Sequence, residues 1–270
     1  MTARPPRFPL ALDRMAPAAR HSADDLLRPQ RLLQQAAASS ARVRPPSGLG
    51  LDTLAVRTRM VDRLCAAGLG NDAVLRAMAA VPRHGFVDSA LATQAYEDTS
   101  LPIGLGQTIS KPSVVARMLA LLFEGVNARA ANGLGRVLEI GTGCGYQTAL
   151  LALLSTSVVS IERLQALHDK ARHHLVALRD GRVRLVFGDG MHGHPPNAPY
   201  DSIVAAAGGD ALPPAWLEQL AVGGRLVAPL ADGGSGAQQL VVVERSAEGF
   251  RRHTHEAVRF VPLRSGVQAI

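Results

Sequence analysis

The amino-acid sequence predicts an α/β fold with a doubly wound, mostly parallel sheet and an N-terminal helical cap. After Gly135, short apolar segments alternate with segments of helical periodicity, which is typical of strand–helix–strand units. The apolar segments are almost uninterrupted, as in strands that are buried on both faces of a sheet. The last apolar segments follow one another without predicted helices, which indicates an antiparallel edge.

The first 48 residues differ in composition from the rest of the chain. Residues 1–50 contain eight Arg and three Asp, which leaves only +2 of the net charge of +7 for the other 220 residues. The sequence therefore predicts a basic, disordered arm over residues 1–48 and a globular domain over residues 49–270. The Arg-rich start is also similar to an organellar transit peptide, although its three acidic residues argue against one.

Composition excludes several classes of protein. No segment reaches the roughly 18 uninterrupted apolar residues of a membrane helix, and aromatic residues make up only 4% of the chain, so few rings could stack on nucleic acid. Cys65 and Cys144 are too few and too far apart for a disulfide framework or a zinc motif. We expect a cytoplasmic monomer with no membrane or specific nucleic-acid partner, and no metal.

The helical cap is predicted over residues 51–124. Apolar residues recur at helical spacing in three segments, which span residues 52–67, 72–81 and 113–123. Asn71 or Asp72 can cap the second helix, and Pro82 ends it. The segment between the second and third helices is predicted to consist mainly of loops.

The core of the sheet is predicted over residues 135–270. Its strands are expected at residues 137–140, 158–162, 183–187, 201–207, 225–230, 239–245 and 257–263. Its helices are expected at residues 146–154, 164–178 and 214–220. In such sheets ligands bind beyond the carboxyl ends of the strands, so we expect the functional residues there.

A glycine-rich loop follows the first core strand in the segment VLEIGTGCGYQ, residues 137–147. Glycines at this place let a ligand approach the backbone closely. The dinucleotide fingerprint GxGxxG/A requires a small residue at its last position, which is occupied here by Tyr146 when the motif is counted from Gly141. A phosphate-binding GxxxxGK[ST] motif is also absent. The spacing ExGxGxG instead resembles the cofactor loop of class I methyltransferases, which bind S-adenosyl-L-methionine on a Rossmann-like fold.

This resemblance implies a set of cofactor-binding residues, which comprises Glu139, Gly141, Thr142, Gly143, Gly145, Glu162, Asp189 and Gly190. Glu139 is expected to face the amino group or the sulfonium side of the cofactor. Glu162 ends the second strand, where a carboxylate can accept both ribose hydroxyls. Asp189 follows the third strand and is expected to accept from the adenine amine. Taken singly, either acid could be a strand-end or turn residue.

The segments before and after the loop resemble the protein-L-isoaspartate O-methyltransferase family over residues 55 to 265. The motifs that carry the resemblance are VPRHGFV (81–87), AYEDTSLPIGLGQTIS (95–110), VLEIGTGCGYQ (137–147), GDG (188–190), LAVGGRLVAP (220–229) and VRFVPL (258–263). The resemblance implies methyl transfer from S-adenosyl-L-methionine to the free α-carboxylate of L-isoaspartyl residues in damaged proteins and peptides. A different carboxylate or a small-molecule acceptor is the alternative.

The resemblance also implies an acceptor site in the QTIS motif, formed by Gln107, Thr108, Ile109 and Ser110. Ser110 matches the active-site serine of the family, and its hydroxyl is expected to orient the acceptor carboxylate. A helix cap is the alternative role for Ser110. Two segments depart from the family pattern, 205–210 and 231–237, so the sequence does not identify the rim of the acceptor site.

Overall fold

A computed structural model of the chain describes residues 54–176, 181–231 and 237–269. The predicted arm over residues 1–48 and most of the loop predicted at 231–237 lie outside the described residues. Among the described residues, no helix is long and apolar enough to cross a membrane. Cys65 and Cys144 are both free thiols.

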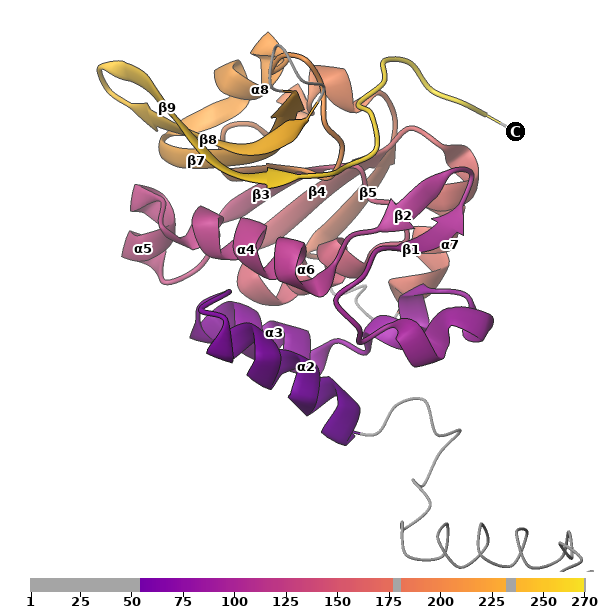
Figure 1. Cartoon of the computed structure of the whole chain (residues 1–270). Helices are drawn as coiled ribbons and strands as arrows, with labels where there is room; N and C mark the ends of the chain where they lie inside the picture. Colours follow the sequence, from indigo (N-terminus) through magenta and orange to yellow (C-terminus); the bar gives the residue numbers. More distant parts are fainter. Residues whose placement is uncertain (1–53, 177–180, 232–236, 270) are drawn as a thin grey trace, which may run out of the picture. The chain divides into compact units, whose positions relative to one another are not determined.

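A seven-stranded sheet forms the centre of the described domain, in the order β5-β4-β3-β6-β7-β8-β9 (Figure 1). The strands are β3 (Arg136–Ile140), β4 (Ser157–Glu162), β5 (Val183–Phe187), β6 (Tyr200–Ala205), β7 (Leu220–Ala231), β8 (Gln238–Ser246) and β9 (Gly249–Val258). The pairs from β5 to β7 are parallel, and β8 and β9 add an antiparallel edge. The predicted fold class, a doubly wound sheet with an antiparallel edge, is confirmed.

Two apolar layers hold helices against the two faces of the sheet. Successive residues of a strand point to opposite faces, so Val137 belongs to one buried cluster and Leu138 to the other. The first cluster packs α4 (Pro112–Phe123), α6 (Tyr146–Leu154) and α7 (Gln165–His174) against the sheet, and α2 (Leu54–Ala66) and α3 (Asp72–Ala80) pack in turn on α4 and α6. The short helix α8 (Pro214–Gln219) covers the other face with Trp216 (Figure 1).

The helices of the cap begin and end close to the predicted residues. Asn71 caps α3 through a 2.9 Å hydrogen bond from the backbone N–H of Val74 to its side-chain oxygen. This bond satisfies one of the free donors at the start of the helix. The cap also contains the 3₁₀ helices η2 (Arg83–Phe86) and η3 (Ser89–Gln94).

Three elements differ from the sequence predictions. The expected loop contains an antiparallel hairpin of β1 (Leu101–Gly104) and β2 (Gln107–Ile109), and a short helix α5 (Val126–Ala131) follows α4. The last strand is β9, not residues 257–263. Because β9 is an exposed edge strand rich in charged residues, it lacks the apolar pattern that the prediction relied on.

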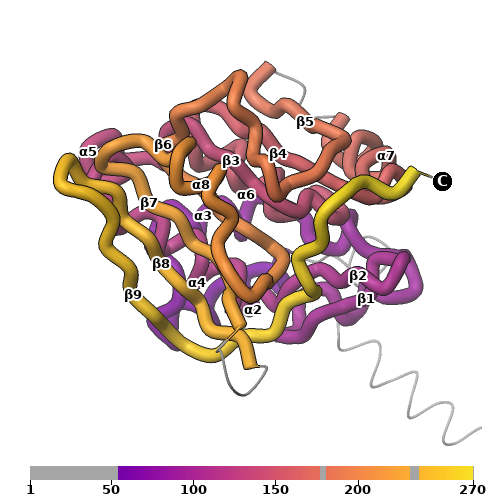
Figure 2. Tube along the Cα trace, turned by 90° about the horizontal axis from the view of Figure 1, so that it is seen from above, coloured from indigo at the N-terminus to yellow at the C-terminus, as the bar shows by residue number. Residues whose placement is uncertain are grey.

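Residues 259–269 leave the sheet after β9 and run back across its carboxyl end. Figure 2 shows this segment passing the β1–β2 hairpin and approaching α7. The N–H of Leu263 donates to the carbonyl of Gly208, and the N–H of Gly208 donates to the carbonyl of Val261. Near the end of the segment, Gln268 pairs with Leu164. The apolar residues 259–263, which the sequence predicts as part of a strand, therefore lie in an extended segment that crosses the carboxyl edge of the sheet.

Candidate active site

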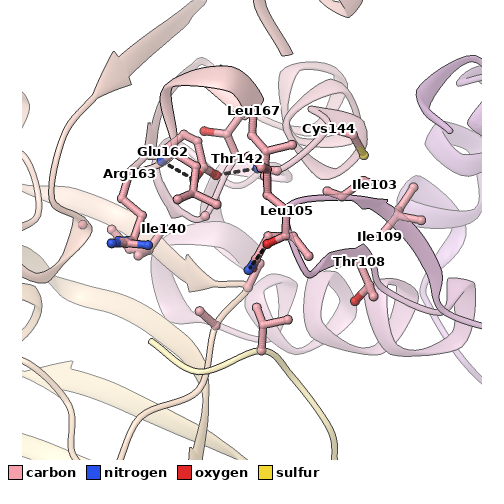
Figure 3. Close-up of a pocket in the computed structure, with 18 of the residues that line it drawn as sticks. Ile103, Leu105, Thr108, Ile109, Ile140, Thr142, Cys144, Glu162, Arg163 and Leu167 are labelled. Carbon is pink, nitrogen blue, oxygen red and sulfur yellow. Dashed lines mark hydrogen bonds between the residues drawn. The ribbon is translucent and has the colours of Figure 1, made fainter. Parts of the chain in front are cut away.

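A cavity of about 330 Å³ lies beyond the carboxyl ends of β3, β4 and β6. Its wall includes most of the residues that the sequence predicted for the two sites: Gln107, Thr108, Ile109, Ser110, Gly141, Thr142, Gly143, Glu162 and Gly190. Glu139, Gly145 and Asp189 do not line it. Figure 3 shows Glu162 and Thr142 on one side, and Thr108 and Ile109 of the hairpin on the other. The fold thus brings the glycine loop and the QTIS segment to one cavity.

The glycine loop turns between β3 and α6 with its backbone close to the cavity. Gly143 has a φ of 56° and Gly145 has a φ of 91°, values in the left-handed region that residues with a Cβ rarely adopt. A Cβ on Gly143 would lie 3.3 Å from the side chain of Ile103 in the hairpin. The loop therefore needs glycine both for its turn and for the space beside the hairpin.

Glu162 lines the cavity at the end of β4 and is almost fully buried. One carboxylate oxygen accepts from the N–H of Gly143 at 2.9 Å, and the other accepts from the N–H of Leu164 at 2.9 Å. An ionised carboxylate has about four acceptor positions. Two positions therefore remain for hydroxyl groups of a ligand, which is compatible with the predicted ribose contact.

Glu139 lies under the glycine loop, not at its surface. Its fully buried carboxylate accepts hydrogen bonds from Gln147 (3.1 Å), Thr148 (2.5 Å) and Ser160 (2.6 Å). Burial raises the pKa of Glu139 to about 7, against the opposing effect of these three donors. Ser160 also bonds to the hydroxyl of Thr142. Glu139 was expected to face a cofactor, but it does not line the cavity, and in this geometry it supports the loop through Ser160.

Asp189 also has a different environment from the one expected. Its carboxylate accepts from the N–H of Met191, the hydroxyl of Ser265 and the N–H of Gly266. Burial alone would raise the pKa of Asp189, but the hydrogen bonds from Gly266, Met191 and Ser265 hold it below its ordinary value. Asp189 thus joins the loop after β5 to the C-terminal segment. Gly190 lines the cavity and accepts from the indole N–H of Trp216 at 2.8 Å.

The QTIS segment forms β2 and the turn into α4. Lys111, not Ser110, is the N-cap residue of α4, and its own side chain makes no capping hydrogen bond. The first free N–H group of the helix, that of Ser113, donates instead to Asp98, which also accepts from the hydroxyl of Ser113. Among the described residues, the hydroxyl of Ser110 has no hydrogen-bond partner, while Ser110 lines the cavity. This geometry leaves that hydroxyl available to a ligand and removes the alternative role as a helix cap.

Sequence reasoning missed several residues of the cavity wall. The C-terminal segment contributes Val261, Pro262, Leu263, Arg264 and Gln268, the hairpin contributes Ile103, Leu105 and Gly106, and the loop after β6 contributes Ala206 and Ala207. The side chain of Arg163 donates to the carbonyl of Gly266, and the N–H of Gln268 donates to the carbonyl of Arg163. No local pattern marks these residues, because their position depends on contacts between distant parts of the chain.

The histidines do not form a metal centre in the part of the chain that the structure describes. No group of three or more His, Cys, Asp or Glu side chains there could hold an ion. His174 contacts the backbone carbonyl of Cys144 at 2.8 Å through its Nδ1 atom. The polar side chains that line the cavity carry hydroxyls, amides, the carboxylate of Glu162 and the guanidinium groups of Arg163 and Arg264.

Comparisons with known proteins agree on one family. The family model described as Protein-L-isoaspartate(D-aspartate) O-methyltransferase (PCMT) matches residues 55–268. Protein-L-isoaspartate O-methyltransferase from Methylibium petroleiphilum is 61% identical over 97% of this chain and 96% of that protein. The protein of the same name from Leptothrix cholodnii is 57% identical over 96% of this chain and 94% of its own length.

Solved structures show the same fold. A structure named protein-L-isoaspartate O-methyltransferase superposes with a TM-score of 0.67 and 29% identity, over 76% of this chain and 65% of that chain. A putative protein-L-isoaspartate O-methyltransferase from Plasmodium falciparum, in complex with S-adenosyl-L-homocysteine, superposes with a TM-score of 0.65 and 22% identity, over 77% of this chain and 98% of that chain. On the family match and the two near-full-length relatives, this chain belongs to the protein-L-isoaspartate(D-aspartate) O-methyltransferase family.

Proposed function

We propose that this enzyme transfers the methyl group of S-adenosyl-L-methionine to the free α-carboxylate of L-isoaspartyl residues in damaged proteins and peptides. The observation that carries the proposal is the single cavity into which the glycine loop, Glu162 and Ser110 all open. A methyl transfer needs a cofactor site and an acceptor site in contact with each other. The family of the chain supplies the identity of the two ligands.

The residues of the cavity fit S-adenosyl-L-methionine. Gly141 and Gly143 both have positive φ angles and line the wall, so the backbone can approach a ligand without an intervening Cβ. Glu162 has acceptor positions left for ribose hydroxyls, and Gly190 offers a backbone wall without a side chain. When bound, the cofactor supplies an electrophilic methyl group on a sulfonium ion.

The acceptor requires orientation more than activation. A carboxylate is already ionised near neutral pH, so no strong general base is needed to make it nucleophilic. We propose that the hydroxyl of Ser110 donates to one carboxylate oxygen and fixes the direction of the other. Gln107, Thr108 and Ile109 form the adjoining wall, where they exclude water and hold the peptide. Correct alignment of two reactants can supply a large part of a rate enhancement.

Methylation of a pair of matched peptides tests this function. One peptide contains an L-isoaspartyl residue and the other contains normal aspartate at the same position. With labelled methyl donor, we expect base-labile label in the isoaspartyl peptide and almost none in its twin. Equal labelling of the two peptides, or labelling of neither, would contradict the proposed acceptor. Labelling of small carboxylic acids in preference to the peptide would support the alternative acceptor.

A further inference from the structure

Arg83 is a buried cation directly behind the QTIS segment. It belongs to η2 and its side chain is completely buried. Its Nε atom donates to the carbonyl of Ala95 at 2.8 Å, and one terminal nitrogen, Nη2, donates to the carbonyl of Ser110 at 2.6 Å. Arg83 does not line the cavity, so it does not reach the reacting atoms directly.

The same guanidinium also contacts the start of α6. Its central carbon lies 4.8 Å from the ring centroid of Tyr146, the first residue of α6 after the glycine loop. Tyr146 lines the cavity and is itself almost fully buried. A planar guanidinium can stack on a ring and donate in its own plane at the same time. Arg83 therefore contacts both Ser110 of the QTIS segment and Tyr146, which follows the glycine loop.

The charge of Arg83 is not paired directly with a carboxylate, although Asp98 acts on it electrostatically from a greater distance. Among the described residues, no carboxylate lies within ion-pair distance of it, and its second terminal nitrogen, Nη1, has no hydrogen-bond partner. Buried charges are normally paired, because removal from water is costly. Burial lowers the pKa of Arg83 from its ordinary value, but an arginine stays protonated in proteins. A positive charge without an ion-pair partner next to an acceptor site favours an anionic acceptor.

We propose that Arg83 is a positioning residue of the acceptor site, which fixes the backbone of Ser110 and selects a negatively charged acceptor. This inference rests on the function proposed above. The position of Arg83 behind the carbonyl of Ser110, out of direct contact with the acceptor, is consistent with the change of charge during the reaction. Methyl transfer converts a carboxylate and a sulfonium into a neutral ester and a neutral thioether, so a cation in direct contact with the carboxylate would stabilise the ground state more than the transition state.

Two substitutions of Arg83 separate position from charge. Arg83→Lys keeps the charge but cannot donate to two carbonyls from one rigid plane. Arg83→Met keeps much of the volume and loses both properties. We expect Arg83→Lys to lower kcat about tenfold to a hundredfold, because the serine is no longer held in place, while KM for the isoaspartyl peptide changes little. Arg83→Met should lower kcat and also raise KM.

A competition measurement tests whether the enzyme selects its acceptor by charge. A peptide whose isoaspartyl α-carboxylate is replaced by a neutral amide is compared, as a competitor, with the isoaspartyl acid itself. The wild type and Arg83→Lys should both prefer the acid, whereas Arg83→Met should lose about tenfold of that preference. Calorimetry with S-adenosyl-L-homocysteine shows whether each variant is folded and binds the cofactor product.

Arg225→Lys is the matched control for a buried arginine. Arg225 is also buried and also donates to a carbonyl, that of Leu121, but it lies outside the cavity wall. It should lose stability without a change in kcat or KM of the folded enzyme. If Arg83→Lys behaves like Arg225→Lys in kcat, or if folded Arg83→Met keeps the preference for the acid, the role of Arg83 is wrong. If the wild type itself does not methylate the isoaspartyl peptide, the proposed function fails instead.

Discussion

The carboxylate of Glu162 accepts a 2.9 Å hydrogen bond from the backbone N–H of Gly143. One residue ends β4 and the other lies in the middle of the glycine loop, 19 positions earlier in the chain. The bond connects two of the residues that the sequence assigns to one cofactor. The ribose end and the loop end of the proposed site are thus aligned with each other by the protein itself.

Glu162→Gln tests this connection. A glutamine would turn one of the two acceptor oxygens into a donor, which would face the N–H of either Gly143 or Leu164. We expect the affinity for S-adenosyl-L-homocysteine to fall by about 1–3 kcal/mol, the usual scale of a hydrogen bond to a charged group. Isothermal titration calorimetry measures it, with Glu256→Gln, at an exposed ion pair with Arg117, as the control. Unchanged affinity of Glu162→Gln would remove Glu162 from the cofactor site.

Gly143→Val should prevent cofactor binding in a protein that still folds. The residue has a φ of 56°, and a Cβ would press on Ile103 at 3.3 Å. A strained backbone of this kind costs about 1–3 kcal/mol, and the added side chain also narrows the cavity. Gly181→Val is the control, since Gly181 has a φ of 85° and no neighbour within 4 Å of the added Cβ. Equal loss of cofactor affinity in both variants would mean that the effect is not local to the cavity.

Ser110→Ala should slow methyl transfer by roughly ten- to a hundredfold, because one positioning hydrogen bond contributes about 1–3 kcal/mol to the transition state. Cofactor affinity should stay unchanged, and Ser110→Thr should keep more activity than the alanine variant since it retains the donor. Initial rates on the isoaspartyl peptide measure this. Ser113→Ala, which removes a hydroxyl bonded to Asp98 at the start of the same helix, should leave the rate largely intact. A full rate in Ser110→Ala would show that the hydroxyl has no part in the reaction.

Glu139 predicts a pH dependence of stability. Its pKa is raised from 4.5 to about 7 in the folded protein, so the folded state holds the proton more tightly than the unfolded state. Its contribution to stability is therefore largest below about pH 4.5 and is lost as the pH rises to about 7 and above. The shift corresponds to about 3 kcal/mol in the free energy of unfolding.

Urea denaturation across this pH range, with Glu139→Gln as the reference, isolates that contribution. The variant has no titrating group at this position, so the difference between the two proteins should move in favour of the variant as the pH rises. All other titrating groups are common to both proteins and largely cancel. Parallel stability curves would show that Glu139 does not take up a proton in the folded state over this range.

Local patterns were sufficient for most of the fold. The helix α6 and the strands from β3 to β6 follow from apolar segments that alternate along the chain, and of the two caps that the sequence allows for α3, Asn71 and Asp72, the structure has Asn71. The strand β9 could not be found in this way, because an exposed edge strand carries charged residues on both faces. The hairpin β1–β2 is stabilised by its contact with the rest of the domain more than by its own composition.

The acidic residues of the candidate site show more clearly which contacts the sequence could not predict. Glu162 stands at the end of its strand, where position alone aims the side chain at the carboxyl edge of the sheet. Glu139 stands inside β3, and because both faces of that strand are buried, the sequence does not tell which helix its carboxylate will meet. Asp189 has partners 76 and 77 positions away, Ser265 and Gly266. No local pattern could show that contact.

The segment from Val261 to Gln268 has a consequence for the order in which the site forms. The wall of the cavity extends from Ile103 to Gln268 along the chain, so nearly the whole described domain must be synthesised before the wall is complete. During translation the sheet can begin to fold while residues near Gln268 are still inside the ribosome. A chain at that stage lacks part of the wall of its ligand cavity, so a cofactor bound at that stage would make fewer contacts and would stabilise the protein less.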